Sequence, residues 1–436
     1  MDKKTTLKGM WWVKGNEDDK FIGNLTCGAG YAPILEIFPK EYDFGSPKVP
    51  NGSTLYGDVF DDSRKVRAVT LLECTSSDSW GSLEVGAFLY SQRFVHADCV
   101  AIGMLLDDDE IAQVQAPQEI YLTCPGLDEY SYAHTVEYVW KDNIPPGRAY
   151  RTNDLERIVY TQPEPIVIEI DIGTITISLG QSSTPRDISS RYLIHINLPN
   201  PTPKDEVKFL IYSQFLSFLS IMTGRREYIA KHRLRIDSNQ TRSGSLSIEL
   251  NYGHLAHSTQ ETEYSILQTL LFGSEENMSK FATLFPKWRE NFKFVEGLAF
   301  HYMQMIEQPT RTSLLQAFSH IETYVLERLL EKHKKGMAGI LSEVIRANAD
   351  YFSCSNVYAQ HFPTDRVDHI ATQLANFRHK GIHLKSDKEC IFTPAEVYAY
   401  INLILRSIFL VEMEYPSEDI DNVIQHWYLW NQIKEK

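Results

Sequence analysis

The sequence predicts an α+β protein with a β-rich first half and an all-α second half, and two observations carry this prediction. Before about residue 200, apolar and polar residues alternate over short stretches separated by turn residues, which is the period of β-strands. After Pro203, apolar residues recur every three or four positions, which is the period of amphipathic helices. We therefore expect two kinds of structure, divided near the middle of the chain.

Length, charge and cysteine usage narrow the class of protein. The chain has 436 residues, 43% of them hydrophobic and 23% charged, as in a globular protein of about two or three domains. Its formal net charge of −14 excludes a protein that coats nucleic acid non-specifically. The chain lacks a signal peptide, and its most apolar tract is interrupted by Asn402 and Arg406, so we expect a cytoplasmic protein without a membrane span. The six cysteines are scattered singly, which predicts reduced core thiols.

In the first half, runs rich in β-branched and aromatic residues indicate antiparallel strands. Residues 166–179 form the clearest pair, because they alternate with period two around the turn residues 171–173. The other expected strands of the first half cover residues 21–26, 34–38, 66–74 and 94–103, and a second, shorter β stretch is expected later in the chain, over residues 245–250.

Helical periodicity begins with residues 205–222, and Gly224 stands in the position of a helix C-terminal glycine. The last helix of the chain has the strongest start signal, with Thr393 as N-cap, Pro394 at the first helical position and Glu396 completing a capping box. The expected helices of the second half cover residues 287–307, a segment starting after Pro309, residues 340–350, a segment starting near 364, and residues 394–412.

The sequence lacks several catalytic motifs. It contains neither the glycine-rich loops that bind nucleotide phosphates nor the GxSxG and HExxH motifs of hydrolases and metalloproteases. We expect no bound cofactor and no metal site. Histidine is conspicuous instead, because seven of the fourteen histidines lie between His301 and His383.

Within that region, residues 376–383 read Asn-Phe-Arg-His-Lys-Gly-Ile-His, so four residues separate Arg378 from His383. This spacing alone carries little weight, because Arg225, Arg226 and Arg328 also precede a histidine at a comparable distance. Arg378 differs because a polar residue, His379, follows it, and because it lies near the end of an amphipathic helix in an all-helical region.

The segment resembles the R-x4-H active-site motif of HEPN-domain ribonucleases, which are small all-α domains that cut RNA without a metal. The strands of the first half, with Trp11 and Trp12 near their start, resemble the N-terminal domain of ApeA-type proteins, which carry a C-terminal HEPN nuclease. The resemblance implies a β-rich ApeA-like domain over residues 1–200, a mixed connecting region over 201–285 and a HEPN helical domain over 286–436.

The resemblance also implies a function. It indicates a bacterial abortive-infection protein that degrades RNA, with transfer RNA as an expected substrate, when a phage-derived trigger is sensed by the N-terminal half. In this family two motifs face each other across a shared cleft, which implies a homodimer or a higher homo-oligomer formed through the HEPN domain.

The expected reaction needs a proton carrier and an anion binder. The 2′-hydroxyl of RNA attacks the adjacent phosphorus and leaves a 2′,3′-cyclic phosphate and a 5′-hydroxyl. His383 would act as general base or acid, since imidazole titrates near neutral pH. Arg378 would hold the phosphate oxygens through its planar fork.

Supporting roles fall to four further residues. His379 would orient the catalytic pair or contact RNA. The resemblance implies that Glu322, on the helix that opens the HEPN core, is an acidic residue supporting the site. Lys380 and Lys385 flank the motif and would contact RNA phosphates.

Other interpretations stay open. Arg378 and His383 can form a solvated helix end, where cations are favoured. His379 and His383 are spaced i, i+4 and can bind a metal. A HEPN protein can also bind RNA or a partner without catalysis.

Two charged runs and a pair of tryptophans have competing explanations as well. The basic run of residues 225–235 can track an RNA backbone, although a solvated face after a helix explains it better. The acidic run of residues 107–110 resembles a metal-binding segment, but a hydrated loop explains it. Trp11 and Trp12 are expected in the core.

Overall fold

In the computed structural model the chain divides into two compact units, each built from segments that are far apart in the sequence. Unit 1 comprises Met1–Pro125, Asp171–Val207 and Tyr228–Thr262, and unit 2 comprises Gly126–Ile170, Lys208–Glu227 and Glu263–Lys436. The predicted boundaries at residues 200 and 285 instead divide the chain into consecutive pieces. The structure describes residues 5–28, 31–38, 49–60, 66–82, 89–125, 127, 136–140, 155–160, 164–184, 187–223, 226–239, 241, 244–252, 280–307, 310–329, 336–382 and 389–420.

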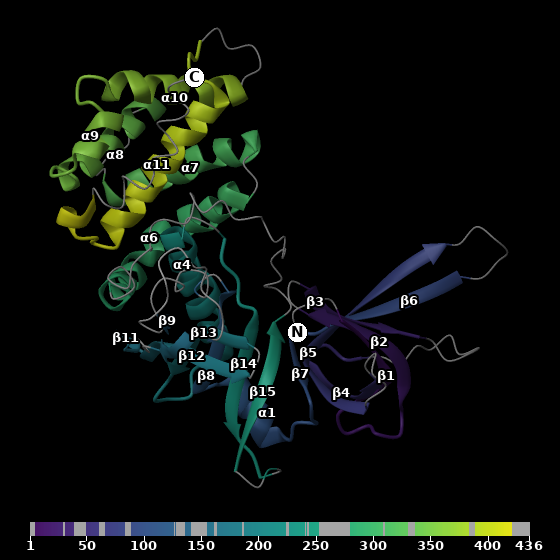
Figure 1. Ribbon diagram of the computed structural model, residues 1–436. Coiled ribbons are helices and arrows are strands. Elements are labelled where there is room, and N and C mark those ends of the chain that lie inside the picture. Colours follow the sequence, from purple (N-terminus) through teal and green to yellow (C-terminus); the bar gives the residue numbers. More distant parts are fainter. Residues whose placement is uncertain are drawn as a thin grey trace. The chain divides into compact units, whose positions relative to one another are not determined.

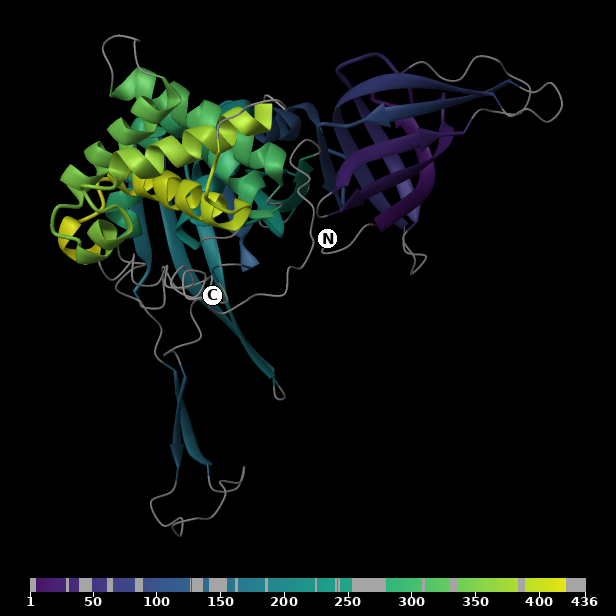
Figure 2. The same ribbon diagram turned by 90° about the horizontal axis from the view of Figure 1, so that it is seen from above.

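In the described part of unit 1, six strands close into an antiparallel barrel. They are β1 (Thr5–Val13), β2 (Phe21–Gly28), β3 (Tyr31–Ile37), β4 (Ser53–Phe60), β5 (Val66–Ser82) and β6 (Leu89–His96). β1 pairs with β2 and β4, β2 with β3, and β4 with β5, while β6 closes the ring by pairing with both β3 and β5. Figure 1 shows these strands in purple to blue, and Figure 2 shows them curving around a shared interior.

The barrel interior is filled by side chains at alternate strand positions. Trp11 on β1 is fully buried, and its Nε1 donates a hydrogen bond to the carbonyl oxygen of Gly23 at 3.2 Å. Gly57 makes room for this ring, because a Cβ there would lie 2.5 Å from a ring carbon of Trp11. Trp12 is also buried and packs edge-on against Tyr56, with ring centroids 6.2 Å apart. The prediction that both tryptophans are core residues is confirmed.

From the barrel strand β5 the sheet continues through β7 into the rest of unit 1. Residues 94–103, predicted as one strand, form both β6 and β7, because the chain changes its pairing partners at Ala97 and Asp98. Asp98 is held there by Lys204, whose Nζ donates to the carboxylate at 2.8 Å. The strands continue in the spatial order β7 (Cys99–Ile102), β15 (Ser245–Tyr252), β14 (Lys231–Asp237), β8 (Glu119–Thr123), β13 (Asp187–Asn197) and β12 (Gly173–Thr184).

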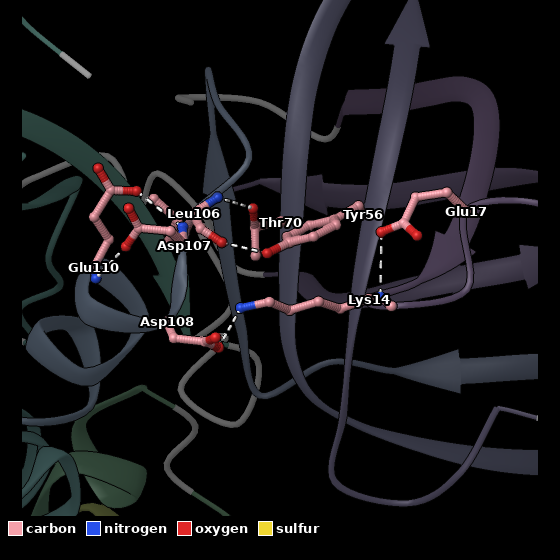
Figure 3. Close-up of polar contacts among 9 residues, drawn as sticks. Lys14, Glu17, Tyr56, Thr70, Leu106, Asp107, Asp108 and Glu110 are labelled. Carbon is pink, nitrogen blue, oxygen red and sulfur yellow. Dashed lines mark hydrogen bonds and ion pairs between the residues drawn. The ribbon is translucent and has the colours of Figure 1, made fainter. Parts of the chain in front are cut away.

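The acidic run of residues 107–110 begins a helix, α1 (Asp108–Gln115), so the expectation of a loop was wrong. Asp107 is the N-cap: its carboxylate accepts from the Glu110 N–H at 2.9 Å, and the Glu110 carboxylate accepts from the Asp107 N–H at 3.0 Å. Figure 3 shows this capping box beside the pair of Lys14 and Asp108, whose Nζ and Oδ1 atoms are 2.5 Å apart. These carboxylates therefore satisfy helix N–H groups and a lysine.

The predicted helix of residues 205–222 is confirmed and extends from Lys204 to Thr223. It consists of α3 (Lys204–Lys208), a π-helical stretch (Phe209–Phe215) and α4 (Leu216–Thr223), while Gly224 lies outside the described residues. In unit 2, Phe218 of α4 packs on α6 (Phe281–Glu307), with its ring centroid 5.2 Å from that of Phe281 and 5.3 Å from that of Phe285. This aromatic packing explains why α6 starts before the predicted residue 287, although Pro286 then lies inside the helix.

The helices predicted for the second half are all present. Thr393 caps the last of them as expected, since its Oγ1 accepts from the Glu396 N–H at 3.3 Å. The short helix α9 is an addition to the predicted set. The remaining described elements of unit 2 are β9 (Val136–Trp140), β10 (Leu155–Tyr160), β11 (Ile166–Ile170), α7 (Arg311–Arg328), α8 (Met337–Tyr351), α9 (Asn356–His361), α10 (Val367–Ile382), α11 (Pro394–Glu412) and a 3₁₀ turn (Ser417–Asp419). The predicted α+β class is confirmed.

Helix α11 is the core helix of this bundle. The Phe409 ring contacts those of Trp288 and Tyr302, with centroids 5.8 and 5.4 Å apart. Among the described helices α11 has the length and apolar character to cross a membrane, and 61% of that stretch is buried within the protein. Such burial is compatible with the core helix of a soluble protein.

The six cysteines are free thiols. Burial raises the pKa of Cys27 and Cys74 to about 12, so both stay protonated at neutral pH. Cys99 and Cys124 are buried as well, whereas Cys354 is exposed and Cys390 half-buried. The expectation of core thiols is confirmed for the four cysteines of unit 1.

Candidate functional site

Helix α10 carries Arg378, the arginine of the predicted motif. Arg378 occupies the position four residues after a buried leucine, so its side chain is directed toward neighbouring helices. A guanidinium so placed requires partners, because burying a charge without hydrogen bonds is costly. The buried side chains that precede it on this face are Val367, Ile370, Ala371 and Leu374.

Helix α7 supplies the partner. Glu322 lies next to the fully buried Ile321, and its Oε2 accepts a hydrogen bond from Arg378 Nη2 at 3.1 Å. The two side chains are 30% and 25% exposed, so the pair lies at an edge of the bundle that is open to solvent. The structure therefore brings together two of the predicted site residues that are 56 positions apart in the chain.

The Arg378 guanidinium has hydrogen-bond donors left over. Its Nε is buried and finds no partner among the described residues. The contact with Glu322 uses one of the five N–H donors of the side chain. Glu322 thus holds the guanidinium in position through one contact, and the partly exposed side chain is of the type that binds phosphate oxygens.

The other residues of the motif differ in what is known of their placement. His379 and Lys380 lie in the last turn of α10, where cations interact favourably with the helix dipole. His379 is half-buried and Lys380 is exposed. His383 and Lys385 lie outside the described residues. The alternative in which His379 and His383 bind a metal together is therefore not tested by the structure.

The chain returns to α10 directly after this segment. Asn376 Nδ2 donates to the Glu389 carbonyl oxygen at 3.0 Å, and the Ile391 N–H donates to Gln373 Oε1 at 2.9 Å. Glu389 and Ile391 therefore lie beside the turn of α10 that precedes Arg378. Sequence reasoning missed these two carboxamides, although their i, i+3 spacing places them on one helix face.

Two histidines of the histidine-rich region take part in packing. The rings of His301 and His320 are 4.9 Å apart, and His301 Nε2 lies 2.9 Å from the Ser313 carbonyl oxygen. His320 packs closely against Gly297 of α6, and burial, followed by the nearby His301, lowers the pKa of His320. In the described part of the chain no group of three or more His, Cys, Asp or Glu side chains could hold a metal ion.

A second arginine with the same spacing to a histidine, Arg328, has different surroundings. Its Nε donates to Glu412 Oε1 at 3.1 Å, and the Tyr324 hydroxyl donates to the same oxygen at 2.7 Å. The ring of Phe294 lies against the guanidinium, 4.7 Å from its central carbon. This cluster joins α7 to α11. The sequence did not predict this cluster, because it indicated Glu412 only as the last residue of a helix.

Residues 231–235 of the basic run lie on strand β14 of unit 1. Arg233 and Arg235 are half-exposed and lie across from acidic residues on neighbouring strands. Arg233 Nη2 is 3.9 Å from a Glu249 oxygen, and Arg235 Nε is 3.5 Å from a Glu119 oxygen. These two arginines are therefore accessible to solvent on a strand face, which fits both a solvated face and contact with an RNA backbone.

Comparison with known proteins bears on the first two thirds of the chain. A family model described as ApeA N-terminal domain 1 matches residues 6–288, from β1 to the beginning of α6. No curated protein and no solved structure matches the chain. Glu322 and Arg378 lie beyond the matched range, so the HEPN resemblance of residues 286–436 stays a prediction. The match covers more than half of the chain, which therefore belongs to the family with ApeA N-terminal domain 1, an indication of a protein of anti-phage defence.

Proposed function

We propose that this protein is an endoribonuclease of anti-phage defence that cuts RNA, transfer RNA among its substrates, by a metal-independent mechanism. The observation that carries the proposal is the incomplete ion pair of Arg378 and Glu322. It joins the arginine of the R-x4-H motif to the acidic residue that the HEPN resemblance implies, and the hydrogen bonds of the guanidinium are only partly satisfied among the described residues.

In this reaction the 2′-oxygen of RNA forms a bond to the adjacent phosphorus while the bond from phosphorus to the 5′-oxygen breaks. The 2′-hydroxyl gives up its proton to a base, and the leaving 5′-oxygen takes a proton from an acid. His383 serves as the base or the acid. Arg378 binds the non-bridging oxygens, where negative charge grows in the transition state.

Supporting roles fall to the residues around the motif. His379 orients the catalytic pair or contacts RNA, and Lys380 and Lys385 contact phosphates. His379 and Lys380 lie in the last turn of α10, the helix that carries Arg378.

Assembly and control belong to the proposal as well. The protein acts in the cytoplasm as a homodimer or higher homo-oligomer formed through the helical domain. The N-terminal half senses a phage-derived trigger, because a ribonuclease that cut host RNA at all times would kill the host. The family membership supports the defence role, since residues 6–288 match an ApeA N-terminal domain.

The test is cleavage of labelled total transfer RNA by the purified full chain in EDTA, followed by mapping of the cut ends. We expect the wild type to leave 2′,3′-cyclic phosphates and the His383→Ala variant to leave the RNA intact. If the wild type is silent, the assay is repeated with extract from phage-infected cells. RNA that is bound but never cut in either assay would contradict the enzyme and favour a non-catalytic RNA-binding protein.

A further inference from the structure

The two faces of the sheet in unit 1 differ in burial. Along the described side chains of β8, β12, β13 and β14, buried residues alternate with half-buried or exposed ones, and we call the face of the latter the open face. The open face carries polar, aromatic and charged side chains and Leu193, whereas the buried face is mostly aliphatic and also holds Tyr192 and His232. The aliphatic residues of the buried face include Ile120, Leu122, Ile175, Ile177, Ile194, Ile196, Leu234 and Ile236.

Strand register aligns the open-face residues in rows. The central row runs across five neighbouring strands through Thr176, His195, Tyr121, Arg233 and Glu249. Within it, the rings of Tyr121 and His195 stack in parallel, with centroids 4.5 Å and planes 5° apart. The two rings form an aromatic ridge on the sheet.

The aromatic ridge has unused hydrogen-bonding capacity. The His195 side chain is half-buried, and its imidazole Nε2 is buried and finds no hydrogen-bond partner in the described part of the chain. A buried polar atom without a partner lowers the stability of the fold. Packing alone therefore does not explain a histidine at this position.

Beside the aromatic ridge, β14 carries a ladder of cations. Lys231, Arg233 and Arg235 point to the open face at every second position, so the Cα atoms of neighbouring cations are about 7 Å apart. The distances of 3.9 and 3.5 Å that separate the two arginines from Glu249 and Glu119 are long for salt bridges. Because the arginines are half-exposed, these pairs are weak and can be exchanged for other anions.

We infer that this open face binds single-stranded RNA. A row of cations beside aromatic rings matches the two recurring groups of a single strand, phosphates at regular intervals and bases with π-faces. The hydroxyls of Thr174, Thr176 and Ser178 border the aromatic ridge on its other side, where they can meet ribose hydroxyls and base edges. An acidic peptide could form ion pairs with the cations but would have no bases to stack on the aromatic ridge. The aromatic ridge therefore favours RNA as the ligand. The choice of RNA over DNA as the ligand rests on the proposed function; the binding of a single strand does not.

The test measures binding of a fluorescent single-stranded RNA of mixed sequence by anisotropy, over a range of salt concentrations. All proteins carry Arg378→Ala, so the candidate catalytic site cuts the RNA too slowly to affect the measurement and does not contribute its arginine. We expect the triple variant K231Q/R233Q/R235Q to bind at least about tenfold more weakly. Its plot of log K against log salt should flatten by about two units, since each phosphate contact on a single strand contributes about 0.7.

A matched triple variant controls for net charge. Lys8, Lys293 and Arg311 are exposed and lie on other elements, so K8Q/K293Q/R311Q removes the same charge elsewhere. Tyr121→Ala tests the aromatic ridge and should weaken binding about tenfold. DNA of the same sequence should bind more weakly than RNA. Circular dichroism establishes that each variant is folded.

Equal affinities and salt slopes of the two triple variants would overturn the inference, and so would unchanged binding by Tyr121→Ala or equal affinity for DNA. The result is independent of catalysis, because no protein in the assay carries Arg378. Failure of the proposed nuclease would appear only in the cleavage assay.

Discussion

Helix α7 takes part in two arginine–glutamate pairs that differ in how completely their hydrogen bonds are satisfied. Glu412 is 2% exposed and accepts from Tyr324 and from two nitrogens of Arg328. In the other pair, Glu322 makes one contact with Arg378, both side chains are partly exposed, and Arg378 Nε has no partner among the described residues.

The comparison shows how tertiary contacts distinguish two similar sequence patterns. Arg328 and Arg378 each precede a histidine by five positions. The Arg328 side chain is 40% exposed, but its guanidinium makes two contacts with a buried carboxylate and lies against an aromatic ring, as expected for a structural pair. The guanidinium of Arg378 makes one contact with a carboxylate, although its side chain is only 25% exposed. The two pairs therefore differ in how far their hydrogen bonds are satisfied and not in the exposure of the arginine.

The largest expected effect is a difference in the rate of RNA cleavage between variants of Arg378 and Arg328. Arg378→Ala should lower the rate of RNA cleavage by about 10²- to 10³-fold, the loss typical of removing one donor that stabilises transition-state charge. Arg328→Ala should keep the rate within a few-fold of the wild type when assayed below its unfolding temperature. Initial rates on labelled transfer RNA measure both. Equal losses in the two variants would remove the distinction.

Substitution of Glu412 should lower the free energy of unfolding more than substitution of Glu322. Glu412→Ala leaves the buried Tyr324 hydroxyl without its acceptor and Arg328 without its pair, so we expect a loss of about 2–3 kcal/mol in the free energy of unfolding. The partial exposure of Arg328 keeps the loss below that of a fully buried pair. Glu322→Ala should cost less than about 1 kcal/mol, because its pair is solvated. Urea unfolding followed by fluorescence compares them, and a larger loss for Glu322→Ala would reverse the assignment.

Tyr324→Phe tests how much one hydrogen bond contributes to the pair of Arg328 and Glu412. Burial, and then the negative charge of Glu412, raise the pKa of Tyr324, so its hydroxyl stays protonated and donates to the carboxylate. Removing this single hydrogen bond should lower the free energy of unfolding by about 1.5 kcal/mol. The cleavage rate should be unchanged. A variant as stable as the wild type would show that the hydroxyl contributes nothing to the pair.

The smallest effect concerns pH. Because the pKa of His320 is lowered in the folded protein, the unfolded chain takes up a proton below about pH 6.5 that the folded chain resists. Stability should therefore be full above this pH and fall as the pH decreases. Melting temperatures at pH 7.5 and 5.5 should differ less for His320→Gln than for the wild type. The exposed His369, changed to Gln, is the control and should leave the difference unaltered.

Local patterns were sufficient for most helices and strands. The capping box of Thr393 and Glu396 appears where the sequence places it, because a capping box depends only on residues within one turn. The start of α6 was missed because the aromatic contacts of Phe281 and Phe285 with Phe218 outweigh the local signal of Pro286. Helix α1 was missed because a run of carboxylates has no apolar periodicity, and its cap became apparent only from the contacts of Asp107 and Glu110.

The sequence by itself determined the α+β class, the positions of the main helices and Arg378 as a candidate, because these depend on periodicity and on residues close together in the chain. Only the tertiary structure decided that β6 closes a barrel with both β3 and β5, that two units are built from interleaved segments, and that Glu322 rather than Glu412 faces Arg378. These depend on pairings between residues far apart in the chain, which local propensity does not encode. The same holds for the row of Tyr121, His195 and Arg233, which exists only in the register of three strands.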